Sequence, residues 1–145
     1  MDTNIKVQEQ WVHWPPAQPY EDKYYLKKIL FTLNACTFEL TKHNKRIVLH
    51  FKEGIVHYRC TQDLFTLAFL NVLNDCNVSY GKKTFFLVKY STYAKTIQPT
   101  IVQSYTADLL HFCLICDDVL IDILATHEPE FTFSLRSDPD LMPFA

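Results

Sequence analysis

Hydrophobic and polar residues alternate with a period of two across residues 35–60. The apolar side chains of ACTFELT share one face of an extended chain, and so do those of RIVLHF. KHNK separates these two segments and is rich in turn residues, and a KEG turn separates RIVLHF from IVHYRC. This pattern predicts a three-stranded antiparallel meander over 35–60.

The KEG turn leaves the strand register of its hairpin open. A two-residue loop would place His50 opposite His57 and give one apolar and one polar face. Its first position, Glu53, is poorly suited to the positive φ that such a loop needs. A three-residue loop with left-handed Gly54 would instead place His57 opposite Leu49 and mix the two faces.

Two further strands are expected in the same sheet. TFFLVKYST, at 84–92, is rich in β-forming residues and nearly continuous in hydrophobicity, which is typical of a central strand. EFTFSL, at 130–135, alternates like a short edge strand. The predicted sheet therefore has about four to five strands.

Two or three helices are expected to pack against this sheet. The segment at 20–33 has apolar residues at helical spacing, although apolar residues of one parity also permit a strand there. The segment at 62–75 is apolar on most sides and follows Thr61, a suitable N-cap. For 106–125 we favour a helix, with two strands joined at Asp117 and Asp118 as the alternative.

The predicted fold class is therefore α+β, with one globular domain at 20–136. Residues 1–19 contain two tryptophans and three prolines and are expected to form an extension. Residues 137–145 are expected to form a C-terminal tail. On this view, deleting 1–19 leaves the fold intact.

Composition narrows the function classes. The chain has 145 residues, 48% of them hydrophobic, and a net charge of −2, so no global field favours nucleic acid or an anionic membrane. Only two glycines are present. Phosphate-binding loops and the G-x-S-x-G nucleophile elbow require clustered glycines, so the familiar nucleotide and serine hydrolase motifs are excluded.

Cysteine usage and hydropathy suggest a location. The chain has an odd number of cysteines within apolar runs, and its start resembles no signal peptide. The longest uninterrupted apolar stretch, FCLIC, is much shorter than the roughly 20 residues of a membrane-spanning helix. We expect a soluble protein of a reducing compartment, cytoplasmic or nuclear, without a membrane partner.

Three residue groups could carry metal or redox chemistry, and each has a plainer interpretation. His50 and His57 supply only two ligands of a zinc site and are expected on a polar strand face. Cys113 and Cys116 have a zinc-knuckle or redox spacing with His111 close by, but Leu and Ile lie between them and no second ligand pair follows, so core cysteines are favoured. Three acidic residues could hold a divalent ion, although a solvated face is the simpler interpretation. They are Asp117, Asp118 and Asp122. We predict neither a metal nor a cofactor.

Covalent catalysis has no local sequence support. Five serines and six histidines occur, but no motif brings a serine, a histidine and an acid together. The chain is therefore predicted not to be an enzyme.

The preferred function is a non-catalytic interaction subunit or adaptor that docks to a protein partner. Aromatic and apolar residues are abundant in otherwise irregular ends of the chain, and such residues are enriched in interface cores. The candidate contact residues are Trp11, Trp14, Leu141, Met142 and Phe144. A viral or host-directed binding protein is one form of this hypothesis, and self-association is open.

The alternative function is a small nucleic-acid-binding module. One basic cluster at a strand-turn-strand junction, with two lysines further along, could contact a phosphate backbone. The candidate residues are Lys42, Lys45, Arg46, Lys82 and Lys83. Affinity that falls steeply with salt would support this alternative.

Overall fold

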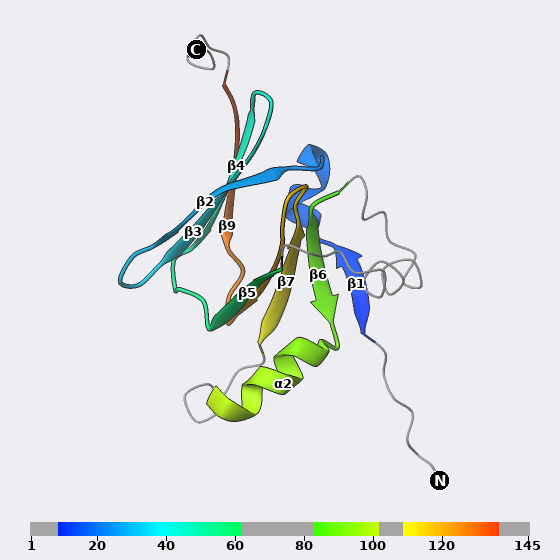
Figure 1. Ribbon diagram of the computed structural model, residues 1–145, viewed down its shortest axis with the longest axis vertical. Coiled ribbons are helices and arrows are strands. Elements are labelled where there is room, and N and C mark those ends of the chain that lie inside the picture. The colour runs from blue at the N-terminus through cyan, green and yellow to red at the C-terminus, as the bar shows by residue number, and fades with distance from the viewer. Residues whose placement is uncertain (1–8, 62–82, 102–108, 137–145) are drawn as a thin grey trace.

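The computed structural model describes residues 9–61, 83–101 and 109–136. Its architecture is mostly β: most of the described residues lie in two antiparallel sheets, and only two short helices occur among them. Figure 1 shows the sheets as two neighbouring layers with one helix at the end of the larger sheet. The predicted α+β class, with two to three helices on one sheet, is therefore wrong.

The first sheet has five strands in the order β1-β6-β7-β8-β5. Its strands alternate in direction, and consecutive neighbours are hydrogen-bonded throughout. The strand bounds are β1 Gln10–His13, β5 His57–Thr61, β6 Phe85–Lys89, β7 Leu110–Ile115 and β8 Leu120–Ala125. The second sheet has the order β2-β3-β4-β9, with bounds β2 Tyr25–Phe31, β3 Cys36–Lys42, β4 Lys45–Phe51 and β9 Glu130–Leu135.

Two short helices complete the described elements. The 3-10 helix η1, Pro15–Tyr20, follows β1, and the α-helix α2, Thr92–Ile101, follows β6. Residues 10–20, expected in an extension, thus supply a strand and a helical turn to the fold. None of the described helices is long and apolar enough to cross a membrane.

Part of the predicted meander is confirmed. β3 and β4 form the expected hairpin, and β9 pairs with β4 as an edge strand. The third strand, β5, leaves this sheet and pairs with β8 in the other one. Gly54 has a φ of 82°, as the three-residue loop required, but His57 lies opposite Leu124, so neither predicted hairpin register forms.

Two segments favoured as helices are strands. The segment at 20–33 contains β2, so the alternation of apolar residues was the correct signal there. The segment at 106–125 contains β7 and β8, joined at Asp117 and Asp118, which was the stated alternative. Both strands are buried on both faces, and this burial removes the polar alternation that would have marked them. The helix predicted at 62–75 lies outside the described residues.

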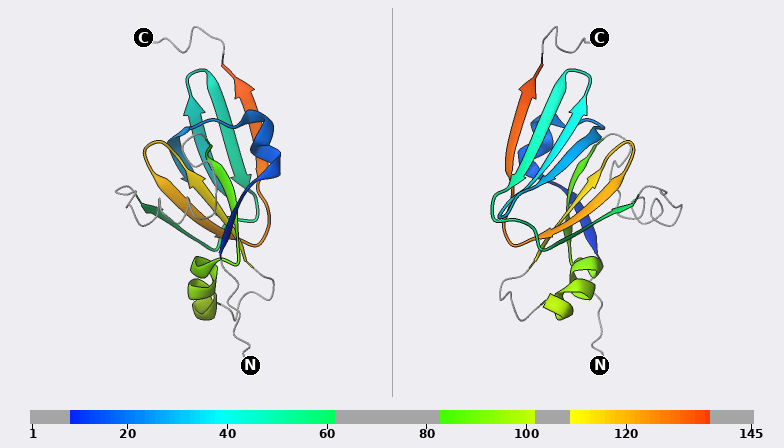
Figure 2. Two further views of the ribbon diagram at one scale, coloured as in Figure 1. Left: turned by 90° about the vertical axis from the view of Figure 1, so that its right-hand side faces the viewer. Right: turned by 60° about the vertical axis from the view of Figure 1, so that its left-hand side comes forward.

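The main core lies between the two sheets. Aromatic contacts join the layers: Phe51 of β4 meets Phe112 of β7, and Phe85 of β6 meets Phe131 of β9, with ring centroids 5.8 and 6.0 Å apart. Trp14 contacts Phe112 and Phe131 and so bridges the layers. The two remaining views show the strands of one sheet lying across those of the other (Figure 2). Buried residues of this cluster include Phe38, Leu40, Ile47, Leu49, Leu114, Ile121 and Ile123.

The opposite face of the five-stranded sheet is also largely buried. A second apolar cluster lies on it, composed of Trp11, Phe86, Val88, Cys113, Ile115 and Leu120. Tyr93 and Ala94 of α2 form a third cluster with Leu124. Polar side chains on this face are therefore enclosed by apolar ones, and they form the candidate site.

Candidate functional site

Ser91, His111 and Asp122 form a continuous hydrogen-bonded chain on this outer face. Ser91 Oγ lies 2.6 Å from His111 Nδ1, and His111 Nε2 lies 2.7 Å from Asp122 Oδ1. All three residues are buried. A serine, a histidine and an acid at these separations are the components of a nucleophilic triad.

The strand register explains how His111 and Asp122 meet. His111 of β7 lies opposite Leu124 of β8, so Asp122, two residues earlier, is its diagonal neighbour on the same face. Asp122 in turn lies opposite Arg59 of β5, whose Nε donates to Asp122 Oδ2 at 3.0 Å. Ser91 follows the end of β6, which pairs with β7.

Electrostatics fix the proton on the His111 ring. Burial alone would raise the pKa of Asp122, but the hydrogen bond from His111 and the ion pair with Arg59 outweigh burial and lower it. Asp122 is therefore an ionised carboxylate at neutral pH, and such a group only accepts hydrogen bonds. In the neutral imidazole, Nε2 then carries the hydrogen, and Nδ1 accepts the hydrogen bond that Ser91 Oγ donates.

Ser91 also begins the helix α2. Its Oγ accepts the backbone N–H of Ala94 at 2.9 Å, the contact of an N-cap residue. Tyr90, between β6 and this cap, has a φ of 57°, which is uncommon for a bulky residue. The turn thus brings a hydroxyl to the end of the sheet through a backbone conformation that usually belongs to glycine.

Tyr93 of α2 packs beside the part of this hydrogen-bonded chain that contains His111 and Asp122. Its ring meets that of His111 with 5.1 Å between centroids, and the guanidinium of Arg59 lies 4.0 Å from its ring centroid. Its hydroxyl is hydrogen-bonded to His57 Nδ1. Burial is the main cause that raises the pKa of Tyr93 to about 12, so the phenol keeps its proton at neutral pH.

A cavity of about 470 Å³ opens beside this chain. Ser91 and His111 line it together with apolar and basic residues from β6, α2 and the start of β7. The other lining residues are Leu87, Val88, Lys89, Tyr90, Ala94, Lys95, Leu109 and Leu110. A mostly apolar hollow with a few converging polar groups is the usual form of a small-molecule site.

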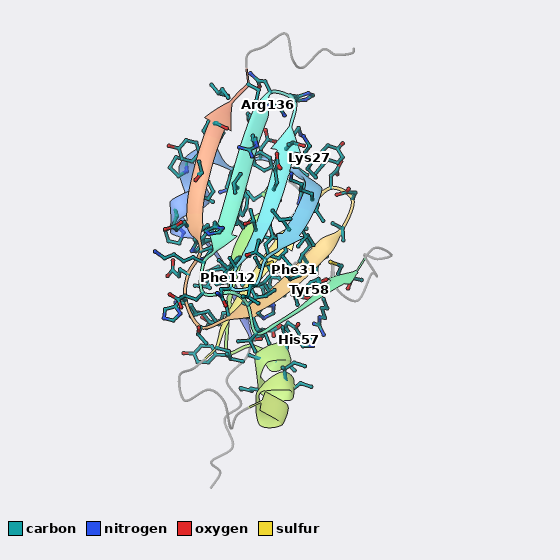
Figure 3. All side chains as sticks on the ribbon, turned by 90° about the vertical axis from the view of Figure 1, so that its left-hand side faces the viewer. Lys27, Phe31, His57, Tyr58, Phe112 and Arg136 are labelled. Atoms are coloured by element: carbon teal, nitrogen blue, oxygen red, sulfur yellow. The ribbon has the colours of Figure 1, made fainter. Side chains whose placement is uncertain are left out.

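A second feature, which we call the aromatic edge surface, lies where the two sheets' edges approach. It consists of Phe31, Leu33 and Tyr58, and each of them is exposed. Leu33 is 94% exposed, and Phe31 is 52% exposed although its ring packs 5.4 Å from that of Tyr58. Figure 3 shows Phe31 of β2 beside Tyr58 of β5.

The two described members of the terminal candidate contact residues, Trp11 and Trp14, lie in the core. Trp11 and Trp14 are only 7% and 2% exposed, and each belongs to an apolar cluster. Trp14 Nε1 also donates to Glu128 Oε1 at 3.1 Å. Leu141, Met142 and Phe144 lie outside the described residues.

The basic cluster is paired with acids of the same chain. Lys45 Nζ lies 2.7 Å and Lys42 Nζ lies 3.3 Å from Asp22, and Arg46 Nε lies 2.7 Å from Glu39. Such pairing weakens the field that a phosphate backbone would meet. Lys83 is described, and its backbone carbonyl accepts a hydrogen bond from Lys23, whereas Lys82 lies outside the described residues.

The histidine and cysteine candidates separate into different surroundings. His50 Nδ1 lies 2.8 Å from Thr37 Oγ1 in the four-stranded sheet, whereas His57 belongs to β5 of the other sheet. Cys113 and Cys116 are buried and free, as core cysteines were expected to be. In the described part of the chain, no three His, Cys, Asp or Glu side chains lie together as potential metal ligands.

Asp122 was considered as part of an acidic group with Asp117 and Asp118, but the structure separates it from them. Asp122 points into the polar chain, whereas Asp117 and Asp118 are exposed in the β7–β8 turn. Ser91 was not a candidate from the sequence, and His111 was noted there only as a neighbour of Cys113 and Cys116. The available signal was the single polar residue in each apolar strand: His111 in LLHFCLIC and Asp122 in VLIDILA.

Comparison of the chain with protein-family models, with curated proteins and with solved structures finds no match.

Proposed function

We propose that the protein docks to a protein partner through the aromatic edge surface. The observation that carries this proposal is the exposure of Leu33, two residues after Phe31, at the end of β2 where the rings of Phe31 and Tyr58 pack together. This keeps the interaction role expected from the sequence and transfers the contact from the chain ends to the sheet edges.

Burial of this surface would supply binding free energy. Fully burying a large apolar side chain is worth about 1.5–3 kcal/mol. Aromatic residues are enriched in interface cores, and a few central side chains usually account for most of the affinity. Leu33 and Phe31 gain most from a partner, because their present exposure is greater than that of Tyr58.

The neighbouring strand edge indicates the form of the partner. β5 pairs with β8 on one side, and no described strand pairs with its other side. All five of its residues are exposed. An exposed edge accepts an extended segment by main-chain hydrogen bonds, with side-chain pockets providing specificity. The partner is therefore a protein whose extended apolar segment adds to β5 and covers the aromatic edge surface.

Site-specific photo-crosslinking tests this proposal. A photoreactive phenylalanine analogue at Leu33 should give a discrete adduct in the native cell, and the same analogue at Leu135 should not. Leu135 is a matched control because it is also a large exposed residue, but it lies on β9. The adduct identifies the partner, or a second copy of this chain, for purification.

Titration of the purified pair then measures the contribution of each side chain. Leu33→Asp and Phe31→Asp should each weaken binding about tenfold or more, as the loss of a central contact does. Leu135→Asp should leave the Kd unchanged. Equal affinity of all three variants, or no adduct at Leu33 above that at Leu135, would contradict the proposal.

A further inference from the structure

We propose that Ser91, His111 and Asp122 hydrolyse esters of small apolar acyl groups that bind in the adjoining cavity. This activity is independent of the docking surface, and it opposes the sequence-based prediction of a non-catalytic chain. It rests on three polar residues from separate elements, two short hydrogen bonds and a cavity whose lining includes the serine and the histidine.

The hydrogen bonds of Ser91, His111 and Asp122 determine which nitrogen of the imidazole acts as the base. Asp122 positions the imidazole by accepting the Nε2 hydrogen, which leaves His111 Nδ1 as the base facing Ser91 Oγ. Triads commonly use the opposite ring nitrogen for the serine, but the chemistry requires only one basic nitrogen at the hydroxyl and one held by the acid.

The reaction balances with water as the co-reactant. Ser91 Oγ bonds to the acyl carbon while its proton passes to His111 Nδ1, and the bond from that carbon to the alcohol oxygen then breaks. Nδ1 returns the proton to the departing alcohol. Water next attacks the acyl-serine and gives a proton to Nδ1, the carbon–Oγ bond breaks, and Ser91 recovers the proton. The products are a carboxylic acid and an alcohol.

The first turn of α2 supplies a donor for the negative oxygen. The backbone N–H of Thr92, the residue after Ser91, donates to Glu9 Oε2 at 2.8 Å. This N–H therefore already holds an anionic oxygen at a helix N-terminus, where negative charge is stabilised. The substrate oxygen takes the place of the Glu9 carboxylate when charge develops on it.

The cavity fits an acyl group better than a charged or large substrate. Leu87, Leu109 and Leu110 give it apolar walls, and its volume of about 470 Å³ lies in the range of small-molecule sites. Lys89 and Lys95 are exposed residues of its lining, where they can attract the carboxylate of the product acid.

Substitutions of Ser91 can distinguish its role as a helix cap from its role as a nucleophile. Ser91 caps α2 through Ala94, and asparagine caps helices as well as serine does but carries no nucleophilic hydroxyl. Ser91→Asn therefore keeps the cap and removes the nucleophile, whereas Ser91→Ala removes both.

The experiment uses the purified full chain with p-nitrophenyl butyrate and with a fluorophosphonate probe. We expect a stoichiometric phosphonyl adduct on Ser91 by peptide mass spectrometry. Turnover should fall at least about 100-fold in both Ser91→Asn and Ser91→Ala. Ser134→Ala, a serine on β9 in the other sheet, should react like the wild type.

The proposal is overturned if Ser91 carries no adduct, or if Ser91→Asn hydrolyses the ester as fast as the wild type. Adduct mapping needs only the wild-type chain, so it decides the matter even where a variant does not fold. Leu33→Asp should hydrolyse the ester at the wild-type rate, so failure of docking and failure of catalysis are distinguishable.

Discussion

At the scale of single residues, Asp122 carries a buried negative charge on the outer face of the five-stranded sheet, and we expect this charge to stabilise the fold. Its carboxylate is buried, and its two oxygens meet His111 and Arg59. Replacing one member of a buried pair leaves the other member without compensation, which typically costs 3–5 kcal/mol. Because the Arg59 side chain is 55% exposed, water compensates part of this loss.

We therefore expect Asp122→Ala to lower the free energy of unfolding by about 2–4 kcal/mol, measured by urea denaturation. The matched control is Glu130→Ala, because Glu130 pairs with Lys52 at 3.3 Å but both side chains are exposed. That change should cost no more than about 1 kcal/mol. Equal losses in the two variants would show that the buried interactions of Asp122 contribute no more to stability than a surface ion pair.

At the scale of elements, the sequence predicted the alternating strands well. It also predicted β6 as a strand, although in the wrong sheet, but it did not favour strands for the apolar segments of β7 and β8. The β3–β4 hairpin and β9 were predictable because each has a polar face, which gives a period of two. β7 and β8 are buried on both faces and lack that period. Helix and strand are then indistinguishable by pattern, and the helix was the wrong choice.

The pairing of strands that are distant in sequence could not be predicted from the local hydrophobic pattern. β5 follows β4 closely in sequence, so a hairpin was the natural expectation, but its partner is β8, more than fifty residues later. The candidate site depends on the same long-range pairings, since Asp122 meets Arg59 only through β5–β8 and His111 only through β7–β8. A single sequence carries no local signal for such contacts.

Trp14 tests whether the segment 10–20 is part of the folded core. The indole is 2% exposed and contacts aromatic rings from both sheets. Trp14→Ala should lower the free energy of unfolding by about 3–5 kcal/mol, the usual cost of emptying a buried aromatic position. Calorimetry or urea denaturation measures this loss.

Trp14→Phe is the control for this change. It keeps an aromatic ring in the core and loses the hydrogen bond to Glu128, so it should cost clearly less than the alanine variant. Deletion of 1–19 should be at least as damaging as Trp14→Ala, in contrast to the expectation from sequence. If the truncated chain had unchanged thermal stability, residues 1–19 would be an extension that does not contribute to the core.

At the scale of the whole molecule, ionised carboxylates join different strands and loops of both sheets. Asp22, just before β2, binds Lys42 and Lys45, which flank the turn of the β3–β4 hairpin. Glu39 meets Arg46 on the neighbouring strand, and Asp122 joins three strands of the other sheet. Acid should therefore loosen both sheets.

The hydrogen bond from Lys45 is the main cause that lowers the pKa of Asp22 from its ordinary 3.8 to about 2. A carboxyl group whose pKa is lower in the folded than in the unfolded state stabilises the fold above the unfolded value. That contribution is lost as the pH falls from about 4 to about 2. We expect the free energy of unfolding to fall over this interval, and to fall less in Asp22→Asn.

Urea denaturation of both proteins at intervals between pH 2 and 7 measures this difference. Glu130→Gln is the control, since its exposed ion pair should leave the pH dependence unchanged. At pH 7 Asp22→Asn should be less stable than the wild type, and the difference should shrink towards pH 2, where the wild-type carboxyl group is about half protonated in the folded state. Parallel curves over the whole range would mean that the Asp22 carboxylate does not contribute to the stability of the fold.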